Sequence, residues 1–162
     1  MKADAGDKLR VLVVENEPIA REILGDLLKM AGYEVLSAHT GEHALLTLVQ
    51  ERGRIDCLFT AIDLPGLVDG WMLADEFRVA DTARPVVFAA RSKPGKAHRS
   101  HGAAFVARPV LPPKAVEAVN KVTGRPAAGP KSRRLPRVVV EAAPQVEMPP
   151  VVASVGLLKA AG

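Results

Sequence analysis

The chain has 162 residues, of which 48% are hydrophobic and 4% aromatic, and it carries a formal net charge of +4. This length allows one ordinary domain, or a smaller domain with an appendage. The single cysteine, Cys57, excludes an intramolecular disulfide and a multi-cysteine zinc site. No apolar run follows the first charges, and no stretch of about 18 uncharged apolar residues occurs, so we expect a cytoplasmic protein without a signal peptide or a membrane span.

The basic excess lies entirely at the carboxyl end of the chain. Residues 1–123 hold 16 basic and 16 acidic side chains, whereas residues 124–162 hold six basic and two acidic ones. The same 124–162 segment contains six of the 13 prolines and no aromatic residue. We therefore divide the chain into a lead (1–8), a folded domain (9–123) and a flexible, disordered tail (124–162).

Short apolar, β-branched runs alternate along the domain with segments whose apolar residues recur at helical spacing. In chain order, the pattern predicts a strand over 9–14, a helix over 18–31, a strand over 33–38, a helix around 44–49, a strand over 56–61, a helix over 71–80, strands over 85–90 and 104–107, and a helix over 111–122. We expect Asn16 to cap the first helix, and Ile19 and Ile23 to lie on its buried face. This alternation predicts an α/β fold with a doubly wound, five-stranded parallel sheet.

The residues most open to a chemical role stand where the predicted strands end. In doubly wound parallel sheets, ligands and chemistry gather at the carboxyl ends of the strands. These positions are residues 15–17, 61–63, 90–91 and 108.

Five short motifs occur in order along the domain: VLVVENEP (11–18), DCLFTAIDLPG (56–66), DGW (69–71), PVVFAAR (85–91) and FVARP (105–109). With this set, residues 9–123 resemble the receiver domain of bacterial two-component response regulators. The resemblance implies a flavodoxin-like sheet with the strand order 2-1-3-4-5. It also implies a site in which an acidic pair after the first strand and an aspartate ending the third hold Mg²⁺, and in which that aspartate accepts a phosphoryl group from a histidine kinase. A hydroxyl ending the fourth strand and a lysine after the fifth contact the phosphate in that family.

Carried over position by position, this chain departs from the family pattern at every functional residue. The acidic pair falls on Glu15 and Asn16, the acceptor on Ala61, the hydroxyl on Ala90 and the lysine on Arg108. Because Ala61 has no nucleophile, we expect an atypical pseudo-receiver that is not an enzyme and is not phosphorylated at the usual place. Because the other positions depart as well, natural degeneracy is favoured over the alternative, an engineered Asp-to-Ala change in a working receiver.

The remaining metal hypotheses are weak. A Mg²⁺ site at Glu15, Asn16 and Asp63 lacks the carboxylates that offset dehydration of the ion, so we expect no cofactor. Asp63 lies two residues past the acceptor position, where we expect a solvated loop rather than a substitute acceptor. The chain has four histidines, His39, His43, His98 and His101. His98 and His101 are three residues apart, but no cysteine or carboxylate lies near them in sequence, so a zinc site is not favoured.

The span from Ala90 to Arg108 is about four residues shorter than the family usual and has no apolar stripe, so we expect the helix between the fourth and fifth strands to be missing or about one turn long. This span is basic and free of acids, which is typical either of a solvated loop or of a protein-binding patch. Phe105 matches the family's switch aromatic, and without a hydroxyl at Ala90 we expect it to be a buried packing residue. The candidate partner surface consists of Arg91, Lys93, Lys96, Arg99 and Phe105.

The tail combines a basic cluster with short apolar runs interrupted by prolines. It is either disordered or a motif that orders on a partner. The neutral domain does not favour nucleic acid as a partner, and weak binding through the tail stays an alternative. The leading hypothesis is a stand-alone, phosphorylation-independent signalling protein that contacts a histidine kinase, a phosphatase or another regulator. The basic cluster consists of Lys131, Arg133, Arg134 and Arg137.

Overall fold

The computed structural model describes residues 8–92, 95 and 102–126. In chain order its elements are β1 (Arg10–Val14), α1 (Pro18–Met30), β2 (Glu34–Ala38), α2 (Gly41–Glu51), β3 (Cys57–Ala61), α3 (Gly70–Phe77), β4 (Val86–Ala90), β5 (Ala103–Ala107) and α4 (Pro112–Thr123). All strand pairs are parallel, and the order across the sheet is β2-β1-β3-β4-β5. The predicted fold class and strand order are therefore confirmed.

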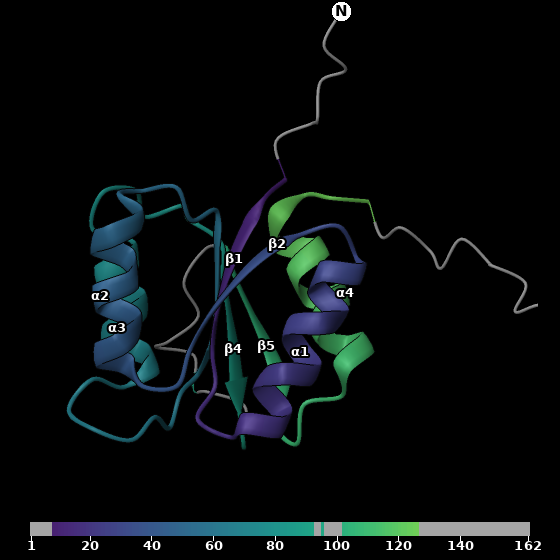
Figure 1. The fold of residues 1–162 in the computed structure, drawn as a ribbon, viewed down its shortest axis with the longest axis horizontal. Coiled ribbons are helices and arrows are strands. Elements are labelled where there is room, and N and C mark those ends of the chain that lie inside the picture. Colours follow the sequence, from purple (N-terminus) through teal and green to yellow (C-terminus); the bar gives the residue numbers. More distant parts are fainter. Residues whose placement is uncertain (1–7, 93–94, 96–101, 127–162) are drawn as a thin grey trace, which may run out of the picture. The chain divides into compact units, whose positions relative to one another are not determined.

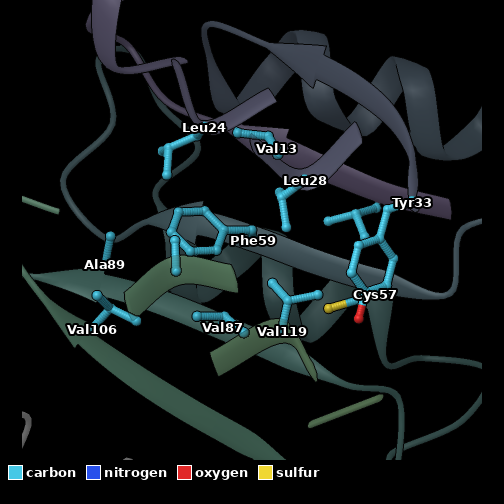
Figure 2. Packing of buried hydrophobic residues seen from close by; sticks show 12 residues of the cluster. Val13, Leu24, Leu28, Tyr33, Cys57, Phe59, Val87, Ala89, Val106 and Val119 are labelled. Carbon is cyan, nitrogen blue, oxygen red and sulfur yellow. The ribbon is translucent and has the colours of Figure 1, made fainter. Parts of the chain in front are cut away.

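The helices cover both faces of the sheet, with α1 and α4 on one side and α2 and α3 on the other (Figure 1). Figure 2 shows the cluster on the α1 and α4 side, where Phe59 of β3 lies among Leu24 and Leu28 of α1 and Val119 of α4. A second apolar cluster fills the opposite face. Every residue of β3 and β4 is buried, as central strands covered on both faces require.

The first helix differs from the sequence prediction at its start. Its N-cap is Glu17 rather than Asn16, and no side chain caps it; Pro18 occupies the first turn, where its missing N–H leaves no carbonyl unpaired. The prediction that Ile19 and Ile23 are buried is wrong, because they are 68% and 44% exposed. The buried face of α1 is instead formed by Leu24, Gly25 and Leu28, and Ile19 and Ile23 lie outside it.

The helix α3 ends at Phe77, three residues before the predicted end. The backbone N–H of Arg78 donates to the carbonyls of Ala74 and Asp75, at 3.0 and 3.1 Å, which closes the last turn. Ala80, expected on the buried face, is exposed. The apolar spacing at 73 and 77 predicted the buried stripe correctly, but this tightened end determines where the helix stops.

The connection between β4 and β5 has no helix among its described residues, which are 91, 92, 95 and 102. The four helices of the described chain thus lack a counterpart to the one that the family resemblance places there. Lys93, Lys96 and Arg99 of the predicted partner surface lie outside the described residues, as do His98 and His101.

The end of α4 and the residues after it contact Tyr33, which directly precedes β2. The Tyr33 hydroxyl donates to Asn120 Oδ1 at 2.6 Å, and the guanidinium of Arg125 lies 4.8 Å from the centroid of the Tyr33 ring. The chain therefore still contacts the fold just past Gly124, and the compact unit falls within residues 1–128. The tail residues Lys131, Arg133, Arg134 and Arg137 lie outside the described part. Within that part, the helices are too short or too polar to cross a bilayer.

A candidate functional site at the carboxyl edge of the sheet

The parallel strands bring the predicted site positions to one edge of the sheet. Glu15 follows β1, Ala61 ends β3, Ala90 ends β4 and Arg108 follows β5. The backbone N–H of Arg108 donates to the carbonyl of Ala90 at 2.9 Å, so β5 delivers its arginine beside the end of β4. Because the strands are parallel, their carboxyl ends lie at the same edge of the sheet, as predicted for these positions.

Glu15 and Arg108 form an ion pair at this edge, with Arg108 Nη2 2.8 Å from Glu15 Oε1. Glu15 is fully buried, whereas the Arg108 side chain is 21% exposed. The same Oε1 atom accepts the backbone N–H of Glu17 at 3.1 Å, while Oε2 is buried without a hydrogen-bond partner. The one acidic side chain that remains of the family's pair is therefore neutralised by a guanidinium of the chain itself.

Arg21 supports this edge from α1 and was missed by the sequence analysis. Its Nη1 atom donates to the backbone carbonyl of Glu15 at 2.7 Å and lies 3.5 Å from that of Asn16. It fixes the turn between β1 and α1 that carries both residues. The position of Arg21 in the sequence is a signal that could have identified this role. A basic side chain in the first turn of a helix lies close to the end of the strand that precedes the helix.

The loop from β3 to α3 is held tightly against the site. A Cβ atom on Gly70 would lie 2.2 Å from the carbonyl oxygen of Ala61, so only glycine fits this approach. On the other side, Glu42 Oε1 accepts the backbone N–H groups of Leu67 and Val68, at 2.6 and 3.3 Å. Hydrogen bonds from its own backbone N–H and from Leu67 lower the pKa of Glu42, which keeps this carboxylate ionised.

The acceptor and hydroxyl positions are methyl groups. Ala61 is fully buried, and Ala90 is 7% exposed. Asn16 and Asp63 are exposed. The five predicted positions thus offer neither a nucleophile at the acceptor position nor a hydroxyl for a phosphate.

The residues present do not fit a magnesium ion. Mg²⁺ requires several hard oxygen ligands whose negative charge offsets its dehydration. Here Glu15 supplies one carboxylate that is already paired with Arg108. Among the described residues, no group of three or more His, Cys, Asp and Glu side chains is arranged to hold a metal ion.

Phe105 packs in an aromatic cluster on the α3 side of the sheet. Its ring stacks on that of Phe88, with centroids 5.3 Å apart and a 17° interplanar angle, and the ring of Trp71 lies 4.4 Å from that of Phe88. Phe105 is half-buried rather than buried as predicted, and its ring centroid lies 6.1 Å from that of Trp71. Arg91, the other described residue of the candidate partner surface, is exposed.

A five-stranded parallel sheet with this strand order, and with its polar positions gathered at the carboxyl edge, is typical of the receiver domains of two-component signalling. The family model of the response regulator receiver domain matches residues 11–120. The chain belongs to this family.

Several relatives and solved structures are similar to the chain. The sensor histidine kinase RcsC of Salmonella typhimurium is 34% identical over 85 residues, which cover 52% of this chain and 9% of that protein. A gliding motility regulatory protein of Myxococcus xanthus is 38% identical over 73 residues, 45% of this chain and 9% of that protein. The chain thus matches only about a tenth of the length of these two curated relatives.

Among solved structures, the receiver domain of the hybrid histidine kinase CckA is 32% identical, with a TM-score of 0.60 over 70% of this chain and 98% of that one. A response regulator receiver protein from Sinorhizobium medicae has a TM-score of 0.65 at 21% identity, over 72% of this chain and 95% of that one. Its likeness is one of fold.

Proposed function

We propose that this chain acts as a phosphorylation-independent pseudo-receiver in a cytoplasmic two-component pathway. The observation that carries the proposal is Ala61: the position that would accept a phosphoryl group is a buried methyl. A methyl group has neither a nucleophile nor a metal ligand, so no acyl phosphate forms there. On this proposal the chain is not an enzyme and uses no Mg²⁺.

The ion pair between Glu15 and Arg108 supports the same proposal. In a working site, the acidic side chain after the first strand would be available to a metal ion. Here the Arg108 guanidinium lies 2.8 Å from Glu15 Oε1 and supplies a permanent positive charge at that place. An internal cation makes the charge balance of the edge independent of Mg²⁺ and of phosphate. The domain then presents one constant surface to its partners rather than a switched one.

A groove beside the outer strand supports an interaction role. It has a volume of about 810 Å³ and lies between the edge of β5 and the face of α4. Its lining is largely apolar, with Pro109 and Leu111 at one end and the charged Lys114, Glu117 and Lys121 along α4. Leu111 is 63% exposed. An apolar floor with charged side chains at its border is typical of protein-binding surfaces. The proposed partner is a histidine kinase, a phosphatase or another regulator.

Phosphorylation is tested by incubating the chain with acetyl phosphate and Mg²⁺ and measuring its intact mass. The receiver domain of CckA, treated in parallel, is the positive control. We expect no mass increase for this chain under conditions that modify the control. An acid-labile phosphoryl adduct on any residue, including the exposed Asp63, would contradict the proposal.

The interaction role is tested by binding measurements with purified histidine kinases and regulators of the same cell, carried out without any phosphoryl donor. The variant Leu111→Glu places a charge in the groove beside β5. The matched control is Leu46→Glu on α2, because Leu46 is similarly exposed, at 55%, and does not line this groove. We expect Leu111→Glu to weaken binding and Leu46→Glu to leave it unchanged. Equal affinities for the two variants would exclude the groove as the contact surface.

A further inference from the structure

Two histidine side chains meet where β2 leads into α2. His39 directly follows β2, and His43 lies in the first turn of α2, whose N-cap is Thr40. Their Nδ1 atoms are 3.3 Å apart, their ring centroids are 5.1 Å apart, and the rings are tilted by 57°. Both residues are exposed.

A hydrogen bond explains this contact only poorly. Hydrogen bonds between a nitrogen donor and its acceptor are usually about 2.9–3.0 Å long, so a separation of 3.3 Å is at the long end of the range. A hydrogen bond also requires one ring to carry its proton on Nδ1 and to direct it at the other. Two exposed rings with access to water have no need of such a pairing.

The same separation suits a shared metal ion. Zinc binds imidazole nitrogen at about 2.0–2.1 Å. Two such bonds that span the observed 3.3 Å enclose an N–Zn–N angle of about 107°, which is close to the tetrahedral angle of about 109° that zinc prefers. At the same bond length, the 90° angle of square and octahedral geometries corresponds to nitrogens only about 2.9 Å apart.

We propose that His39 and His43 form a two-histidine chelate for Zn²⁺, bound through the two Nδ1 atoms with the remaining positions open to water. The neighbouring Glu42 is not part of the proposed chelate; its Oε1 atom accepts the backbone N–H groups of Leu67 and Val68. The positive end of the α2 dipole opposes any cation here. A hard ion such as Mg²⁺, which prefers oxygen ligands, gains little from imidazole to offset this, whereas Zn²⁺ forms directional bonds to it.

Binding is measured by titrating the full chain with ZnCl₂ in a calorimeter, in a buffer that does not bind zinc. The variants His39→Ala and His43→Ala each remove one ligand at an exposed position, and circular dichroism checks that their fold is unchanged. The matched control is the double variant His98→Ala with His101→Ala, which removes the chain's other two histidines. We expect one ion per chain, an affinity at least about tenfold lower in either single variant, and no change in the control.

The mode of ligation is read from the ¹⁵N shifts of the imidazole rings, which distinguish Nδ1 from Nε2 as the bound atom. A large excess of Mg²⁺ should leave the zinc signal in place. The proposal is overturned if the chain binds no zinc, if either single variant binds it as well as the unchanged chain, or if ligation occurs through Nε2.

Discussion

Arg108→Met removes the guanidinium from the edge of the sheet and keeps an unbranched side chain of similar reach. It leaves the Glu15 carboxylate fully buried, with the Glu17 N–H at 3.1 Å as its remaining hydrogen-bond donor. Breaking a buried ion pair by removing one partner costs about 3–5 kcal/mol. Because the Arg108 side chain is 21% exposed, water replaces part of the lost interaction, and we expect the lower end of that range, about 3 kcal/mol.

Urea unfolding followed by circular dichroism measures this loss. With a slope of about 1.5 kcal/mol per molar urea, the midpoint should fall by about 2 M. The matched control is Lys114→Met, because Lys114 pairs with Glu117 at 3.0 Å while both side chains are about two-thirds exposed. An exposed pair of this kind contributes about 0.5 kcal/mol or less.

The double variant Glu15→Gln with Arg108→Met separates loss of the pair from loss of packing. Once both charges are gone, no uncompensated carboxylate remains in the interior. We therefore expect the double variant to be more stable than Arg108→Met alone by about 2 kcal/mol. The reasoning is refuted if Arg108→Met costs no more than Lys114→Met, or if the double variant is as unstable as the single one.

Three further predictions concern other parts of the fold. Burial, with a smaller effect of neighbouring Asp56, raises the pKa of the Cys57 thiol from 9.0 to about 12. Iodoacetamide at pH 8 should therefore label Cys57 only at the rate of unfolding, and rapid labelling of the native chain would contradict this. Tyr33→Phe removes a buried 2.6 Å hydrogen bond to Asn120, and urea unfolding should show a loss of about 1–2 kcal/mol. Backbone hydrogen bonds lower the pKa of Glu42 below 4.5, so its stabilisation of the loop is present above pH 4.5 and is lost as the pH falls through the lower folded-state value. The protection of the Leu67 amide against exchange, taken relative to a free peptide at the same pH, should then fall, and an unchanged protection factor would count against this.

The fold could be predicted because its main signals are local. Buried parallel strands appear in the sequence as short, β-branched runs, and the helices between them repeat their apolar residues every three or four positions. The order of the strands came from the family resemblance rather than from this pattern. Which face of α1 is buried could not be derived from spacing alone, since Ile19 and Ile23 have the spacing of core residues but lie outside the face that Leu24 and Leu28 bury.

The site could be predicted as a set of positions but not as a set of contacts. Strand ends identified Glu15, Ala61, Ala90 and Arg108 correctly as neighbours at one edge. The pairing of Glu15 with Arg108 joins residues 93 apart in sequence, so it depends on the direction each side chain takes after its strand. The contact between the Nδ1 atoms of His39 and His43 depends on the rotamers of both side chains, which composition and spacing do not specify.

The most direct test of the central claim is to restore the acceptor. The variant Ala61→Asp and the unchanged chain are incubated side by side with acetyl phosphate and Mg²⁺, and phosphorylation is followed by intact mass. Because Arg108 occupies the carboxylate of Glu15 and Ala90 offers no hydroxyl, we predict that neither chain is phosphorylated. Phosphorylation of Ala61→Asp would mean that the rest of the site is competent and would support a working receiver disabled at one residue; phosphorylation of the unchanged chain would contradict the account altogether.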